Sequence, residues 1–599
     1  MGLLNDTVPD NRYGGASAQS MKPAHDDIAA FPPIDLQAFQ RRWMTMRLEA
    51  MSKWYMHWRD LSRYINPKRG WFEGFVPNYN AQYDYRLIMD GDPAQYARIL
   101  SSGMSSGLTS PSRPWFRLGL ENIKGEVSAA VKIWLEDVER ILLSIFAKSN
   151  IYDAFQQTYQ ELGMFGTGCF GIYEDFDTVI RCRSYTIGEY YLATDYTGRV
   201  NSFARQFWMT IDQVVSEYGW ENCSQMVQNA YNANNRDQFV LIYTLCEPNL
   251  ARVPGMETFK GMKFRSITWE AQAVATKALK ISGYNEFPIC GPRWETTTTA
   301  DVYGVGPGWF ALGDIKALYR MKKDLYLITN KIGDPPVIID ASVDGQTNML
   351  PGGITRSSAN TPNAGARAAY QIGGDPVTPI RNLIFETKQQ ISSRFYADLF
   401  LMMVNNEKND MTAREVVERH EEKMLMLGPV LSRVQSDMLN PAIDRTFAIA
   451  MRAGLIPSPP PEIEGQPIKV EYISLLAQAQ KMIGTLSIEQ EATFVANLAA
   501  VFPTIVDNFD QDEAVREHSD LLGVPKRVIR SKEDVQAIRD ARAQAQQATA
   551  QQMQMQEAAK TANMLSKTQV GDRNALEHIT GAEPAQAGAG MPQSGGMAQ

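Results

Sequence analysis

The fold prediction starts from residues 304–336, GVGPGWFALGDIKALYRMKKDLYLITNKIGDPP, because they contain a complete helix with both of its ends. Large apolar residues recur there three and four positions apart, as they do on one face of a helix. They are Ile315, Leu318, Met321, Leu325, Ile328 and Ile332. Gly333-Asp334-Pro335-Pro336 ends the helix, since proline cannot donate the next backbone hydrogen bond. Helical periodicity returns only after Pro379, so two helices bracket a Gly/Pro-rich excursion.

Length and composition describe a globular chain of several domain-sized units. The 599 residues are 44% hydrophobic and 10% aromatic, which is enough for large cores. A net charge of −8 argues against nucleic-acid binding over the whole surface, so any such contact should be local. No apolar run reaches about 18 residues and the first residues lack the apolar core of a secretory signal, so we expect neither membrane insertion nor secretion.

The cysteines and histidines predict neither a metal site nor a cofactor. The five histidines form no metal-binding motif, and the five cysteines form no CxxC pair. We expect the cysteines to be reduced and mostly buried. They are Cys169, Cys182, Cys223, Cys246 and Cys290.

The N-terminal half predicts helices followed by a β-rich layer. Asp35 can cap a long helix that carries an aromatic stripe and ends at Ile65, before Asn66-Pro67. A second helical block covers about residues 127–162, with Gly163 as its stop. From Gly166 to about Gly291, short alternating runs predict strands, with a hairpin turn at 193–199 and a helix at 211–218.

The C-terminal half predicts mainly helices. Thr412-Ala413-Arg414-Glu415 is a capping box that begins a helix to about Ala453, with a kink or restart at Gly428-Pro429. Beyond the proline-rich linker 457–461 we expect a compact helical block with a second capping box at Ser487. A lone or bundled helix and a disordered tail should follow.

Catalytic motifs are absent from the sequence. The turn Gly304–Gly308 superficially resembles a phosphate-binding glycine turn, but Pro307 removes one of the amides that such a turn needs. No P-loop occurs, and the carboxylates lie in ordinary charged runs. We therefore interpret 304–308 as a tight turn before a helix and expect a structural or interaction protein, not an enzyme.

Several long motifs in a fixed order resemble the portal, or head-to-tail connector, family of short-tailed, T7-like bacteriophages. They are SRYINPKRGWF at 62–72, LSSGMSSGLTSPSRPWFRL at 100–118, FGTGCFGIYED at 165–175, RSYTIGEYYLATDYTGRVN at 183–201, VYGVGPGWFALGDIKALYRMKKDLY at 302–326, DPPVIID at 334–340 and TAREVVERHEEKMLMLGPVLSRV at 412–434. The resemblance covers about residues 36–460.

The resemblance implies an α+β, mainly helical portal fold with wing, stem, clip and crown regions and a β-rich layer in the wing. The matching ranges are wing at 35–307, stem helices at 308–331 and 378–400, clip at 332–377, channel loop at 401–411 and wing helices at 412–460. Outside the matching motifs, we expect a flexible N-terminal arm at 1–34, a crown at 461–530, a C-terminal helix that could form a barrel at 531–580 and a disordered tail at 581–599.

The resemblance also implies a function and partners. Portal subunits form a ring, typically of twelve, at one capsid vertex, and double-stranded DNA enters and leaves through it without sequence specificity. The implied protein partners are the terminase large subunit, the tail adaptor, and the major capsid and scaffolding proteins. The expected location is the head-tail junction of the virion, after assembly in the host cytoplasm.

Three groups of residues are the candidate sites. The channel loop offers a mixed, weakly binding set: Asn405, Asn406, Glu407, Lys408, Asn409 and Asp410. The stem charges, expected to meet DNA transiently or to pair between subunits, are Lys316, Arg320, Lys322 and Lys323. The clip residues expected to dock the motor and then the adaptor are Asp334, Pro335, Pro336, Pro351, Gly352 and Gly353.

Alternatives remain open from the sequence for each of these predictions. The loop could be a plain surface connector, and the clip could be an internal β-hairpin with no outside partner. The whole chain could be a virion adaptor or scaffold without a DNA channel, or a nucleotide-using enzyme built around Gly304–Gly308.

Overall fold

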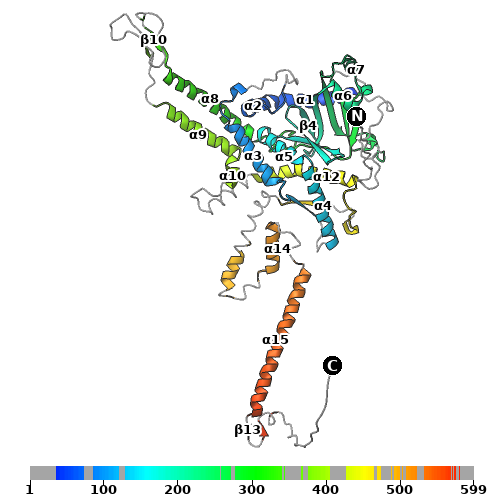
Figure 1. Ribbon diagram of the computed structural model, residues 1–599, viewed down its shortest axis with the longest axis vertical. Helices are drawn as coiled ribbons and strands as arrows, with labels where there is room; N and C mark the ends of the chain where they lie inside the picture. The colour runs from blue at the N-terminus through cyan, green and yellow to red at the C-terminus, as the bar shows by residue number, and fades with distance from the viewer. Residues whose placement is uncertain are drawn as a thin grey trace, which may run out of the picture. The chain divides into compact units, whose positions relative to one another are not determined.

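Helices and antiparallel sheets both occur in the computed structural model, which confirms the predicted mixed class (Figure 1). The structure describes residues 36–72, 85–120, 128–256, 258–271, 277–339, 366–368, 375–404, 427–463, 468–473, 491–499, 508–522 and 532–567, with some shorter pieces and single residues. The chain divides into two units, residues 1–487 and residues 488–599. The predicted arm at 1–34 and its boundary residue Asp35 lie outside the described residues.

The first predicted helix is interrupted at Trp54. Helix α1 covers Leu36–Lys53 and α2 covers Tyr55–Ile65, so the prediction of one helix is wrong in this detail. The interruption is slight, since Trp54 N still donates to the Ala50 carbonyl at 3.0 Å. The Trp54 ring packs between the rings of Trp58 and Trp309, which explains why an aromatic residue stands at the bend.

The second helical block consists of α4, Ala129–Lys148, and α5, Ile151–Phe165, and α3, Asp92–Leu108, packs against α5. The predicted stop at Gly163 is wrong, because α5 continues to Gly166, which has the left-handed φ of +79° that ends helices. Gly163 serves packing instead: a β-carbon there would lie 2.9 Å from Leu100 Cδ2, so glycine lets α3 approach α5.

The predicted β-rich layer is confirmed as two antiparallel sheets with the orders β3-β2-β9 and β4-β5-β6-β7-β8. The strands are β2 Cys169–Asp175, β3 Val179–Tyr185, β4 Tyr190–Thr194, β5 Val200–Thr210, β6 Phe239–Pro248, β7 Phe264–Glu270, β8 Lys280–Tyr284 and β9 Ile289–Cys290. The predicted hairpin turn connects β4 to β5, and the Asp195 carboxylate accepts the backbone amides of Thr197 and Arg199 at 2.9 Å. The predicted helix α6, Ile211–Tyr218, begins with a capping box, and α7, Gln225–Asn232, follows it.

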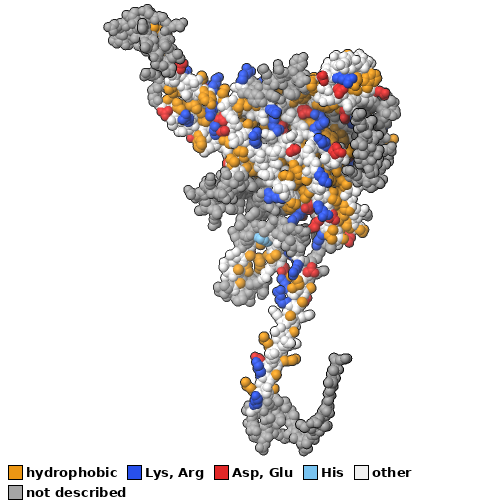
Figure 2. All heavy atoms as spheres, in the orientation of Figure 1, with side chains coloured by type: hydrophobic (Ala, Val, Ile, Leu, Met, Phe, Trp, Pro, Cys, Tyr) orange, Lys and Arg blue, Asp and Glu red, His pale blue; other side chains and the backbone are white. Residues whose placement is uncertain are grey.

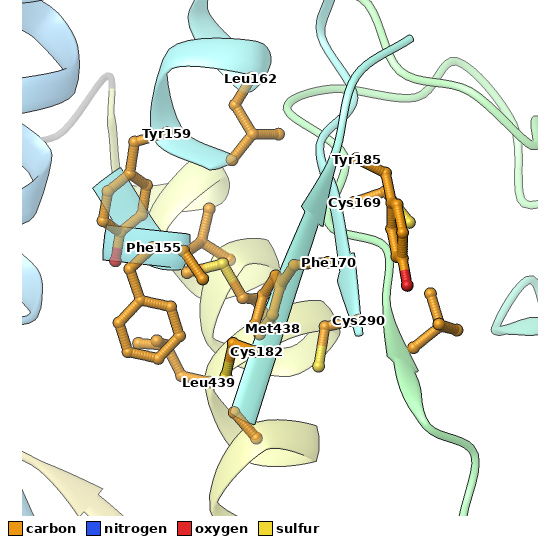
Figure 3. Packing of buried hydrophobic residues seen from close by; sticks show 14 of the residues in the cluster. Phe155, Tyr159, Leu162, Cys169, Phe170, Cys182, Tyr185, Cys290, Met438 and Leu439 are labelled. Atoms are coloured by element: carbon orange, nitrogen blue, oxygen red, sulfur yellow. The ribbon is translucent and has the colours of Figure 1, made fainter. Parts of the chain in front are cut away.

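One continuous core joins the helices to the three-stranded sheet (Figure 3). Phe155 of α5 and Phe170 of β2 point toward Met438 and Leu439 of a later helix. All five cysteines are buried free thiols, as predicted. Burial raises the pKa of Cys182 and Cys246 to about 12, so these thiols stay protonated and behave as apolar side chains.

The two central helices run side by side away from the body of the first unit (Figure 1). Helix α8 covers Pro307–Gly333, close to the prediction, and α9 covers Val377–Arg394. The predicted extension of α9 to residue 400 is wrong, because Tyr396 has a φ of +54° and a separate helix α10 covers Ala397–Val404. Residues 401–404, predicted as loop, are therefore helical.

The later part of the first unit returns to the core. A helix at residues 427–434 leads into a π-helical turn, Gln435–Leu439, and then α12, Asn440–Arg452, which ends at Ala453 as predicted. The irregular turn precedes Pro441, whose missing N–H disturbs the hydrogen-bond ladder. The predicted capping box at Thr412 lies outside the described residues.

The predicted start of the crown at residue 461 is not a structural boundary. Strand β12, Ile468–Tyr472, pairs with β1, Phe116–Leu120, and therefore belongs to the first unit. The proline-rich linker is also held, since Trp134 Nε1 donates to the Pro457 carbonyl at 2.9 Å. A helical prediction for this stretch fails because the partner strand is far away in sequence.

The second unit contains a helix at residues 491–499, α14, Gln511–Leu522, and α15, Lys532–Lys567. Two short strands follow, β13, Gln569–Val570, and β14, Arg573–Asn574. Arg539 binds both carboxylate oxygens of Asp512 at 2.6 and 2.7 Å, which ties α15 to α14. Ser487 and the predicted tail at 581–599 lie outside the described residues.

Candidate stem and channel site

The glycine turn before α8 packs against the end of α5. Gly306 is the N-cap of α8, as the prediction of a tight turn requires, and a β-carbon there would lie 2.5 Å from the Leu162 carbonyl oxygen. The amide of Gly304 donates to Thr167 Oγ1 and that of Val305 donates to the Glu295 carbonyl, both at 2.8 Å. These amides are engaged inside the protein, so the glycines provide close backbone packing and not a phosphate cradle.

The hairpin of α8 and α9 carries a set of buried apolar residues, called its apolar foot, and a second set that is exposed. Ile315 and Leu318 of α8, and Ile384 and Ile391 of α9, are buried. Other large apolar side chains of the two helices are exposed: Tyr326, Leu327, Ile332, Leu383 and Phe385. Figure 2 shows hydrophobic side chains mixed with Lys and Arg side chains on the projecting hairpin. Within the single chain, no described residue covers these exposed apolar side chains.

Asp90, just before α3, binds a lysine from each of the two long helices. Its side chain is only 6% exposed, and its Oδ2 lies 3.2 Å from Lys322 Nζ and 2.7 Å from Lys388 Nζ. Lys388 also contacts Asp92 at 2.5 Å. Burial alone would raise the pKa of Asp90, but Lys388, the backbone amide of Asp92 and Lys322 together outweigh it, so the pKa lies below its usual value. The site is therefore ionised at neutral pH.

Two further ion pairs involve the stem helices. Lys316 Nζ lies 2.7 Å from Asp60 Oδ2 and above the Tyr64 ring, which joins α8 to α2. Arg394 Nε lies 2.6 Å from Asp314 Oδ2, which joins the end of α9 to the start of α8.

The four predicted stem charges therefore fall into two pairs. Lys316 and Lys322 already have carboxylate partners in the same chain. Arg320 and Lys323 are exposed, and neither forms an ion pair with any other residue that the structure describes. Of the four, only Arg320 and Lys323 have no carboxylate partner among the described residues.

Helix α10 carries the chain toward the predicted channel loop. Phe400 is buried, and its ring occupies the space above Gly103 of α3, where a β-carbon would overlap it. On the far side of the loop, Leu427 and Leu431 are buried. The predicted loop residues from Asn405 to Asp410 lie outside the described residues.

The range predicted as the clip begins at the end of α8. Asp334 is the C-cap, and its amide donates to the Asn330 carbonyl at 2.7 Å. Pro335 and Pro336 then lead into β10, Val337–Ile339, which pairs with β11, Ala366–Ala368. Pro351, Gly352 and Gly353 lie outside the described residues.

Asp90, Asp92, Lys388, Gly103 and Phe400 were absent from the predicted site. No local motif marks them, because each contact joins segments far apart in the sequence. Only Gly103 has a signal in the sequence, and that signal is indirect. It lies within the motif at 100–118, at a position where no turn requires a glycine.

The described part of the chain offers neither a metal centre nor a membrane span. Within it, no group of three His, Cys, Asp or Glu side chains is placed to hold a metal ion. No helix there is both long enough and apolar enough to cross a membrane.

The comparison with known proteins defines the class of protein. Residues 36–529 match the family described as bacteriophage head to tail connecting protein. The chain therefore belongs to this head-to-tail connecting family, which confirms the resemblance seen in the sequence. Proteins of this class are structural components of the phage particle.

Two curated relatives are similar over almost their whole length. The probable portal protein of Bordetella phage BPP-1 is 38% identical over 544 residues, which cover 90% of this chain and 97% of the relative. The portal protein of Salmonella phage epsilon15 is 39% identical over 539 residues, which cover 90% and 95%. Chains in the virion of a native gene transfer agent particle and in the neck of an empty one are 12% identical, with TM-scores of 0.35 and 0.34; each match covers 75% of this chain and 95% of the other.

Proposed function

We propose that this chain is the subunit of a portal ring at one capsid vertex, through which double-stranded DNA enters during packaging and leaves during ejection. The observation that carries the proposal is the family match over residues 36–529, together with portal relatives similar over nine tenths of the chain. Ring formation also accounts for the exposed apolar side chains of the α8–α9 hairpin, which a neighbouring subunit would cover.

The hairpin is the proposed wall of the channel. The 27 residues of α8 span roughly 40 Å, a length suited to a tunnel wall. Leu327 is 47% exposed and Phe385 is 62% exposed, so both helices carry apolar surface to an interface. A ring of about twelve copies, as in the family, is the proposed assembly.

Imaging of the purified protein by electron microscopy tests the ring directly. A portal should show a ring with a central hole. Uniform monomers at high protein concentration, or a closed particle without a hole, would favour a virion adaptor or scaffold without a DNA channel instead.

Arg320 and Lys323 are the proposed DNA-facing or subunit-pairing charges of the stem. Weak contact suits a conduit, because each neutralised phosphate releases counterions and tightens binding to DNA that has to move. We expect Arg320→Glu with Lys323→Glu to lower the amount of packaged DNA or the stability of the ring, with Lys331→Glu at the exposed end of α8 as the matched control. If packaging and ring stability both stay unchanged, this role is excluded.

The channel loop of Asn405, Asn406, Glu407, Lys408, Asn409 and Asp410 remains the proposed point of closest approach to DNA. Its one cation stands beside two carboxylates, so its attraction to phosphate is small. Replacing all three asparagines with serine should change DNA retention in filled heads without changing ring assembly. Normal retention would make the segment a plain connector.

The clip is the proposed docking surface for the terminase large subunit and then for the tail adaptor. The exposed sheet β10–β11 projects from the end of the stem, next to Asp334, Pro335 and Pro336, and the segment with Pro351, Gly352 and Gly353 lies between its strands in sequence. Replacing residues 346–362 with a short Gly/Ser linker should abolish binding of motor and adaptor while rings still form. Retained binding would make the clip an internal hairpin only.

The remaining proposed contacts follow from the position of a portal in the particle. The wing and crown regions would meet the major capsid and scaffolding proteins while the head assembles in the host cytoplasm. The C-terminal helix α15 has almost entirely exposed side chains, which leaves a barrel of neighbouring copies as the proposed arrangement.

A further inference from the structure

Helix α3 contacts the stem helices at one end and the channel-side helix α10 near its middle. We infer that α3 is a strut that fixes both in one arrangement, with Asp90 as the positioning residue for the stem and Phe400 as the positioning residue for α10. The geometry stands without the proposed function, and only its consequence for DNA passage rests on it.

The first contact is a carboxylate shared by both stem helices. Asp90 Oδ2 receives Lys322 of α8 and Lys388 of α9, so one nearly buried side chain holds the two helices together and to the body. The backbone contributes as well, since Tyr319 Oη lies 3.1 Å from the Asp90 carbonyl oxygen and 2.7 Å from that of Tyr64. Ion pairs with this little exposure are screened much less than surface pairs.

The second contact is apolar and involves Gly103, about three helical turns after the start of α3. Gly103 has no side chain, and the Phe400 ring fills that space. Any larger residue at position 103 would push α10 away from α3. Because α10 includes residues 401–404, the first part of the predicted channel loop, this contact sets where that part lies.

The third requirement of a strut is that it is itself fixed. Leu100 is fully buried against Gly163 of α5, and Thr109 Oγ1 lies 3.2 Å from Tyr159 Oη in the interior. Helix α3 is therefore part of the rigid core, and the stem and α10 are attached to it from two sides.

The alternative is that the apolar foot of the hairpin alone orients the stem. Ile315, Leu318, Ile384 and Ile391 are buried there, and the ion pairs would then add nothing to its position. The two explanations predict different effects when Asp90 loses its charge. The direction of the hairpin becomes less fixed if the ion pairs hold it, and stays the same if the apolar foot holds it alone.

Spin-label distances in the full-length protein separate them. One label pair joins Lys331, at the exposed end of α8, to Arg63 on α2, and a second joins Leu401 on α10 to Arg63. Labelled subunits are diluted with unlabelled protein, so that only distances within one chain are measured. The five native cysteines are buried and do not compete for the label.

Asp90→Asn should make the distance distribution of the Lys331 pair about twofold wider, and Phe400→Ala should do so for the Leu401 pair alone. The control is Asp153→Asn, which removes an exposed carboxylate from α5. Unchanged width in Asp90→Asn, or equal widening in Asp153→Asn, overturns the proposal. If Asp90→Asn does not fold, Lys322→Gln releases α8 alone and must still widen the Lys331 pair.

The distances are measured without DNA, motor or capsid. A widened stem in a protein that forms no ring would support the strut and contradict the portal proposal. A ring with a central hole, in which Asp90→Asn leaves the width of the Lys331 pair unchanged, would support the portal proposal and contradict the strut.

Discussion

Gly306 lies so close to Leu162 that a β-carbon at position 306 would stand 2.5 Å from the Leu162 carbonyl oxygen. This contact attaches the first turn of α8 to the last turn of α5. The glycine is required by the neighbouring backbone, which cannot move aside as a flexible side chain could.

Gly306→Ala should therefore destabilise the first unit by about 1–3 kcal/mol, the usual cost of overpacking a rigid site. Gly313→Ala is the matched control, because it lies in the same helix and a β-carbon there would meet no described atom within 4 Å. That change should stabilise by about 1 kcal/mol, since alanine favours helices. Urea unfolding measures both, and equal effects would contradict the packing role of Gly306.

Asp437→Ala should destabilise by about 3 kcal/mol, because it leaves a buried guanidinium without its partner. Arg293 Nη2 lies 3.1 Å from Asp437 Oδ2, and both side chains are mostly buried. The exposed pair of Glu49 and Lys53, at 3.3 Å, provides the control. Glu49→Gln should change the free energy of unfolding by less than about 0.5 kcal/mol, and a comparable loss in both variants would contradict the prediction.

Glu139→Gln should remove a pH dependence of stability between about pH 5 and pH 8. Burial raises the pKa of Glu139 to about 7, against the opposing effect of Arg117. The folded state then keeps a proton that the unfolded state has lost, so stability falls as pH rises from the unfolded value of 4.5 through about 7.

At about pH 8, Glu139→Gln should stabilise by about 1 kcal/mol, a value reduced for partial exposure, and at about pH 4 it should be neutral. Thermal unfolding at several pH values measures this. An Asp153→Asn variant serves as the control, and an identical pH profile for Glu139→Gln and the unmodified protein would refute the prediction.

The Asp90 ion pairs should hold the stem through the whole neutral range. The pKa of Asp90 lies below 3.8 and that of Lys388 lies above 10.5, so their contribution is lost only as pH falls below the first value or rises above the second. The Lys331 label pair should therefore keep its width from about pH 5 to about pH 9. Widening at about pH 6 would show that another titrating group holds the stem.

Local signals in the sequence predicted the elements that depend on local chemistry. Helix α8 has a complete apolar stripe between a glycine turn and two prolines, and α6 has its own capping box. The hairpin between β4 and β5 follows from two residues of the turn. The Asp195 carboxylate accepts the amide of Thr197, and Gly198 adopts the left-handed backbone conformation. Each of these carries its start and stop signals within its own stretch of sequence.

The remaining features depend on contacts between distant segments. Gly163 and Gly166 are both glycines near the end of α5, and only the neighbouring Leu100 shows that the first serves packing. The break at Tyr396 involves neither glycine nor proline, so no breaker marks it. The Asp90 site joins residues more than two hundred positions apart in the chain, which periodicity does not report.

The pairing of β1 with β12 sets a timetable for synthesis. Phe116 lies opposite Tyr472, so the first strand waits for a partner that leaves the ribosome roughly 20–70 s later at ordinary elongation rates. Until then the backbone groups of β1 that pair with β12 have no partner strand, and the growing chain remains attached to the ribosome. A subunit that closes this sheet last completes its first unit only when nearly all of that unit has been made, which delays association between unfinished copies.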